Sequence, residues 1–101
     1  MLTSKQRAQL RALAAAEDTI VHIGKGGITE NIIIQLNDAL KARELVKGRV
    51  LEASLLTARE ACDALAAACR AEPVQVIGSK FVLYKRNEQK PGIELAKAKK
   101  R

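Results

Sequence analysis

At 101 residues, the chain has room for one domain with a single hydrophobic core. Apolar residues make up 48% of it and charged residues 29%, a balance typical of a folded globular protein, which argues against an intrinsically disordered chain. The formal net charge is +7, and most of the excess lies at the C-terminal end, where residues 80–101 contain eight basic and two acidic side chains. A basic end of this kind favours a polyanionic partner such as nucleic acid, unless it is a solvated tail that keeps the protein soluble.

The sequence indicates neither a membrane protein nor a metalloprotein. No apolar run approaches the roughly 18 residues of a membrane-spanning helix, and charges interrupt the apolar residues of the N-terminus, so we expect no membrane span and no secretory signal. Cys62 and Cys69 share one face of a predicted helix about 10 Å apart, too far for a disulfide. Two free thiols favour a reducing, cytoplasmic location. With His22 they do not make up a metal site, and we expect no cofactor.

Helices and strands alternate along the chain. Side-chain caps at Thr3, Thr29 and Thr57, together with helical periodicity, predict three helices at residues 4–16, 30–43 and 58–71. Short β-branched and apolar runs predict four strands at residues 19–23, 45–51, 74–77 and 81–84. Pro73 is expected to end the third helix, and residues 78–80 to form a tight hairpin turn.

This order of elements, α-β-α-β-α-β-β, predicts an α/β fold. A helix between the first two strands favours a parallel crossover, and the final hairpin adds two antiparallel strands. The expected architecture is a mixed four-stranded sheet packed with helices. We assign it to residues 1–86 as one domain, followed by a basic, flexible tail at residues 87–101, where the chain becomes polar and rich in lysine.

The segment Gly24-Lys25-Gly26-Gly27 joins a predicted strand to a capped helix. Such a G-x-x-G loop clamps the nucleic-acid backbone in KH domains, because glycine admits a close approach and the helix N-terminus attracts phosphate. The alternative is a sharp connection with no ligand. A nucleotide site is not expected, because the chain contains neither G-x-x-x-x-G-K-[ST] nor G-x-G-x-x-G.

Four segments in the same order resemble the single-domain YhbY proteins of the CRM family, and together they span most of residues 2–86. They are residues 3–14, 21–30, 44–50 and 74–86. The resemblance implies a fold similar to the C-terminal domain of bacterial translation initiation factor three. It also implies that the protein binds ribosomal RNA in precursors of the large ribosomal subunit, as an assembly factor, through the G-x-x-G loop and adjacent basic surface. Gly48 departs from the family pattern, since a β-branched residue is expected there, and indicates a weakened strand or a bulge.

The candidate RNA-binding residues are the loop glycines and lysine and the cations expected to lie near them: Gly24, Lys25, Gly26, Gly27, Arg7, Arg11, Lys47, Arg49, Lys80, Lys85 and Arg86. Each cation has a plainer interpretation as part of a solvated helix or strand face. Tyr84 is either a stacking platform for a base or a half-buried strand residue, and the second is favoured. His22 is interpreted as structural.

We expect no enzymatic activity and no small-molecule substrate. No Ser/His/Asp grouping, pair of carboxylates or cluster of metal ligands can be assembled from the sequence, so a hydrolase or nuclease is the least favoured class. The alternative to RNA binding that remains is a protein-interaction module, which would use a sheet edge or helix face and the basic tail.

Overall fold

The computed structural model describes residues 2–86, and its elements follow the predicted order. Its three helices are α1 (Ser4–Ala14), α2 (Glu30–Arg43) and α3 (Ala58–Cys69). Its four strands are β1 (Thr19–Ile23), β2 (Leu45–Val50), β3 (Glu72–Ile77) and β4 (Lys80–Tyr84). The tail predicted at 87–101 lies outside the described residues.

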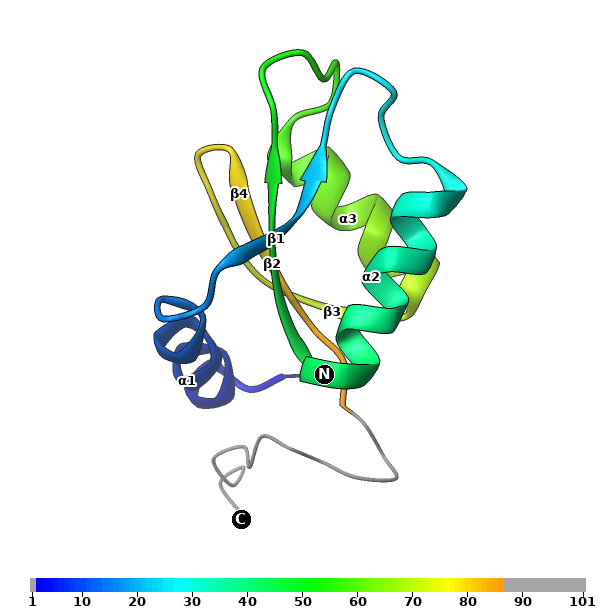
Figure 1. Cartoon of the computed structure of the whole chain (residues 1–101). Helices are drawn as coiled ribbons and strands as arrows, with labels where there is room; N and C mark the ends of the chain where they lie inside the picture. The colour runs from blue at the N-terminus through cyan, green and yellow to red at the C-terminus, as the bar shows by residue number, and fades with distance from the viewer. Residues whose placement is uncertain (1, 87–101) are drawn as a thin grey trace.

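The strands form one mixed sheet in the order β1-β2-β4-β3, which confirms the predicted fold class. β1 and β2 are parallel, whereas β2 pairs with β4, and β4 with β3, in antiparallel fashion. Helix α1 lies on one face of the sheet, and α2 and α3 lie on the other (Figure 1). The sheet is therefore the middle layer of three.

Because strand side chains alternate between faces, each face of the sheet has its own apolar cluster. The larger cluster joins the sheet to α2 and α3, and its largest members include Val21, Ile23, Leu36, Leu65 and Phe81. The smaller cluster, under α1, consists of Leu10, Ala14, Leu45, Val74, Val82 and Tyr84, with Leu2 against it. The α1 face is covered by a single helix, and it carries the sheet-face part of the candidate site.

The predicted helix starts are confirmed, but two of the predicted ends are too late. Both capping boxes form, at Thr3 and at Thr57, through reciprocal hydrogen bonds with the third residue of each helix. α1 ends at Ala14, and α3 ends at Cys69 because Arg70 adopts a left-handed conformation with φ 56°. Pro73 therefore does not end α3 but lies within β3. An edge strand tolerates a residue that lacks an N–H.

Gly48 does not mark a bulge in β2, and the strand runs unbroken through it. β2 and β4 pair in unbroken register from Leu45 to Arg49, and the register shift lies in the neighbouring strand, between Thr19 and Val21. A Cβ on Gly48 would lie only 2.3 Å from Cζ of the Phe81 ring. The glycine therefore makes room for an aromatic ring on the next strand.

Each edge of the sheet carries a feature that limits further strand pairing. On the β3 edge this is Pro73, which has no N–H to donate. On the β1 edge the Gln35 side chain, from α2, donates a hydrogen bond to the Ile20 carbonyl over 3.1 Å.

Candidate nucleic-acid interface

Three connections meet at one end of the sheet. β1 and β2 run parallel, so the loops that follow them, residues 24–29 and 51–57, leave from the same end. β4 runs the opposite way, which brings the turn at residues 78–79 to that end as well (Figure 1). The predicted G-x-x-G loop is therefore one of three neighbouring connections.

The G-x-x-G loop is a turn closed by a hydrogen bond from the Gly27 N–H to the Gly24 carbonyl over 3.0 Å. Gly27 has φ +69°, so its backbone conformation favours glycine. Gly24 and Gly26 are not in that conformation, and a Cβ on Gly26 would meet its nearest neighbour, Thr29 Cγ2, at 3.9 Å. The turn itself therefore requires glycine only at Gly27, while Lys25 and Gly26 lie exposed at its tip.

Helix α2 begins directly after this loop. The Thr29 hydroxyl accepts a hydrogen bond from the Ile32 N–H at 3.2 Å, which fixes the first turn of the helix. The first N–H groups of a helix and its dipole give this end a partial positive charge. An anion held by the loop would be close to that charge, with the Lys25 ammonium beside it.

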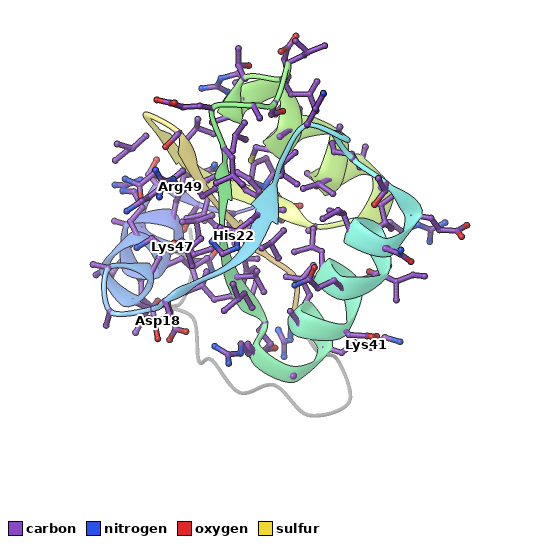
Figure 2. The ribbon with its side chains drawn as sticks, turned by 45° about the horizontal axis from the view of Figure 1, so that its top comes forward. Asp18, His22, Lys41, Lys47 and Arg49 are labelled. Atoms are coloured by element: carbon purple, nitrogen blue, oxygen red, sulfur yellow. The ribbon has the colours of Figure 1, made fainter. Side chains whose placement is uncertain are left out.

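The exposed part of the α1 face carries a row of directly paired residues, one from each strand. His22 pairs with Arg49, Arg49 with Lys80, and Lys80 with Ile77. Cross-strand partners point to the same face of a sheet. Figure 2 shows His22, Lys47 and Arg49 together on the side where α1 lies, while Lys41 lies far from them on α2. The structure thus adds His22, which was interpreted as structural, to two of the predicted cations.

Next to this row, a groove of about 450 Å³ lies between the C-terminal half of α1 and the sheet. Its lining combines cations with apolar and small side chains: Arg11, Ala12, Ala14, Ala15, Lys47, Gln75, Ile77, Lys80 and Val82. Lys47 is half-buried, and its ammonium donates a hydrogen bond to the Ala14 carbonyl at 3.3 Å. A lysine of the sheet therefore fastens the end of α1, which forms one wall of the groove.

Three predicted cations lie elsewhere. The Arg7 guanidinium donates a hydrogen bond to the Pro73 carbonyl over 2.7 Å, so this half-buried side chain ties α1 to β3. Lys85 and Arg86 follow β4 at its far end, roughly 17 Å from Lys80 at about 3.4 Å per residue. Apart from Arg7, the candidate residues therefore form a loop group, a group along the sheet face and α1, and a separate pair at the opposite end of the sheet.

Tyr84 and the two cysteines are buried and take no part in this surface. Burial raises the pKa of Tyr84, and the nearby Glu44 carboxylate raises it further. The prediction of two free thiols is confirmed, and both lie buried. Burial raises the pKa of Cys62 to about 11. Within residues 2–86, no three His, Cys, Asp or Glu side chains are grouped as metal ligands would be. Nor is any helix of that part of the chain long and apolar enough to cross a membrane.

The sequence also matches a known domain. The model of the CRS1 / YhbY (CRM) domain matches residues 2–85, almost the whole described region. The chain belongs to this family. The predicted resemblance is confirmed, and the CRM domain coincides with the three-layer unit that carries the loop and the row.

Relatives of this CRM protein are similar over most of their lengths. The Bacillus subtilis protein named "Probable RNA-binding protein YqeI" is 41% identical over 94% of this chain and 99% of its own. A Haemophilus influenzae protein named "RNA-binding protein" is 33% identical over 87% of this chain and 89% of its own. The solution structure of SAV1595 from Staphylococcus aureus, which has been proposed to bind RNA, matches with a TM-score of 0.79 and 47% identity. That match covers 95% of this chain and all of SAV1595.

These names describe RNA binding and no enzymatic activity. The similarity to the C-terminal domain of translation initiation factor three stays a prediction.

Proposed function

We propose that this CRM protein binds RNA through the G-x-x-G loop and the basic row on the α1 face. The observation that carries the proposal is the arrangement at one end of the sheet. An exposed lysine on a glycine turn, a helix N-terminus and the row from His22 to Lys80 lie on adjacent elements there. RNA binding in the names of relatives that align along most of the chain supports it.

In this proposal, the loop holds the RNA backbone and the row extends the contact. A phosphate at the turn gains from the α2 N-terminus and from Lys25, and the open space around Gly26 lets the backbone come close. Arg49 and Lys80 then neutralise further phosphates, and the counterions they release make the affinity dependent on salt. Lys85 and Arg86 lie at the far end of the sheet, so they would contact only an RNA long enough to extend there from the loop.

We further propose that the RNA is ribosomal and that the protein acts in the cytoplasm as an assembly factor on precursors of the large ribosomal subunit. The resemblance to YhbY proteins supports this finer assignment. Crosslinking in cells, followed by sequencing of the recovered RNA, tests it. Enrichment of large-subunit ribosomal RNA, with precursor ends retained, is the expected result. Enrichment of messenger or transfer RNA instead would refute the ribosomal assignment.

Two loop variants test RNA binding itself. Lys25→Glu reverses the charge at the tip, and Gly26→Asp adds a negative side chain where the structure leaves room for one. Each should weaken RNA binding at least tenfold, about 1.4 kcal/mol or more, with little change in thermal stability. Lys5→Glu is the matched control, since it makes the same change of charge at the exposed first turn of α1, where a carboxylate suits the helix dipole.

Wild-type affinity in a well-folded Lys25→Glu protein would refute the loop assignment. If binding to a partner were also indifferent to salt, the protein-interaction module predicted as the alternative would be favoured.

A further inference from the structure

The groove beside α1 has an apolar floor that phosphate binding alone does not explain. Arg11, Lys47 and Lys80 supply positive charge around it, whereas Ala15, Ile77 and Val82 supply apolar surface within it. Ile77 is 63% exposed, a large aliphatic side chain left open to solvent on an otherwise basic face. This pairing of charge and apolar surface matches a nucleotide, which has an anionic phosphate and a flat base with apolar faces.

We propose that the groove is a subsite for one unpaired nucleotide of the bound RNA. The base lies against Ala15, Ile77 and Val82, and its phosphate lies near Lys80 and Arg11. This assignment rests on the proposed function and deepens it, because it states that the RNA is single-stranded where it contacts the α1 face.

Size and charge both fit that occupant. A groove of about 450 Å³ falls within the range of roughly 300–1,000 Å³ that is typical of small-ligand pockets. Its lining includes no carboxylate, so nothing in it repels a phosphate. The Gln75 amide is the one lining side chain that could both donate and accept hydrogen bonds at a base edge, which implies weak discrimination among bases.

An RNA strand held at the loop can also reach the groove. His22 lies two residues before Gly24, or roughly 7 Å along an extended chain, and Lys80 lies two strands from His22, or roughly 10 Å across the sheet. Arg49 lies between them in the row. A single RNA strand can follow the row from His22 to Lys80 and place a base in the groove. The bases of an RNA duplex, in contrast, remain stacked and paired.

The first test compares two exposed isoleucines. Ile77→Ser removes the apolar floor, and Ile34→Ser is the matched control, because Ile34 is 51% exposed on α2, across the sheet. With a short single-stranded RNA oligonucleotide, we expect about fivefold weaker binding for Ile77→Ser and no change for Ile34→Ser. The salt dependence of Ile77→Ser should equal that of the wild type, because both proteins carry the same charge.

Lys80→Gln should have the complementary signature. Its affinity should fall, and the slope of log K against log salt should become shallower by about 0.7 for each phosphate that the protein no longer neutralises. A slope unchanged from wild type would place the phosphate away from Lys80 and overturn this part of the inference.

The second test detects the base directly. Adenosine monophosphate, added to the full-length protein and followed by NMR, should shift the methyl signals of Ile77 and Val82 and the amide signal of Ala15. Inorganic phosphate at the same concentration should leave those methyl signals in place. Equal shifts with both probes would show that the groove is only an anion site and would overturn the inference.

The two proposals fail in different ways. If Ile77→Ser binds single-stranded RNA as the wild type does while Lys25→Glu binds weakly, the nucleotide subsite is refuted and the loop-based function stands. If the wild-type protein binds neither single-stranded nor duplex RNA, the proposed function is refuted as well. A preference for the duplex would likewise overturn the subsite while leaving RNA binding intact.

Discussion

Replacing Gly48 with alanine would place a methyl group against the ring of Phe81. The new Cβ would lie 2.3, 2.6 and 2.9 Å from three ring carbons, whereas ordinary contacts begin at 3.4 Å, so the ring would have to move by about 1 Å. Phe81 is almost completely buried in the larger core and has little room to move. Overpacking of this kind costs typically about 1–3 kcal/mol, and the upper end applies to a ring enclosed on all sides. Replacing glycine with alanine within a strand stabilises the fold by about 0.5–1 kcal/mol, so the net loss of free energy of unfolding is about 2 kcal/mol.

In a domain of this size, such a loss lowers the melting temperature by about 8–16 °C. Thermal unfolding followed by circular dichroism measures it. Gly26→Ala is the control, because its Cβ has open space, and its stability should be unchanged or slightly higher. Adding Phe81→Leu to Gly48→Ala should recover part of the loss, since the two changes act on the same contact. A Gly48→Ala protein that melts at the wild-type temperature would show that the ring does not rest on Gly48.

Four further outcomes are expected. Tyr84→Phe should raise the free energy of unfolding, measured by urea titration, by up to about 1 kcal/mol, because the buried hydroxyl has no hydrogen-bond partner within residues 2–86. A clear fall in that free energy would show that the hydroxyl has a partner. At pH 8, iodoacetamide should leave Cys62 and Cys69 unmodified in the folded protein and alkylate both in denaturant. Because the pKa of Cys62 is raised from 9.0 to about 11, its thiol stabilises the folded state below pH 9, and that contribution should be lost as the pH rises through 11. In a Cys62→Ala protein, the free energy of unfolding should fall less over this pH range than in the wild type. Deleting residues 87–101 should make the salt dependence of RNA binding shallower while the melting temperature stays the same, and a drop in that temperature would show that the domain extends past residue 86.

Local signals predicted most of the fold. Side-chain caps such as Thr3 and Thr57 fix a helix start through bonds to residues three positions away, so these starts were predicted correctly. Helix ends depend on less local information. Arg70 ends α3 in a left-handed conformation that is unusual for arginine, and the pattern gave no sign of it. Pro73 was then misinterpreted, because whether a proline breaks a helix or lies in an edge strand is decided by the sheet.

The candidate site was predicted as a set of residues but not as an arrangement. Lys47 and Arg49 lie on one face of the sheet, as alternation along a single strand requires. The neighbours of Arg49 depend on cross-strand register, which pairs it with His22 and Lys80. His22 was missed for that reason. The groove was not predictable either, because it exists only where α1 ends on the sheet, two residues earlier than expected.

The two protected edges of the sheet bear on how the protein behaves at high concentration. An unprotected edge strand offers its backbone groups to another chain and can seed sheet-to-sheet aggregation. A strand that added beside β1 would have to displace the Gln35 amide from the Ile20 carbonyl. A strand that added beside β3 would meet Pro73, which has no N–H to donate. Both routes to extension are therefore disfavoured, and a concentrated solution of the domain should resist aggregation through sheets joined edge to edge.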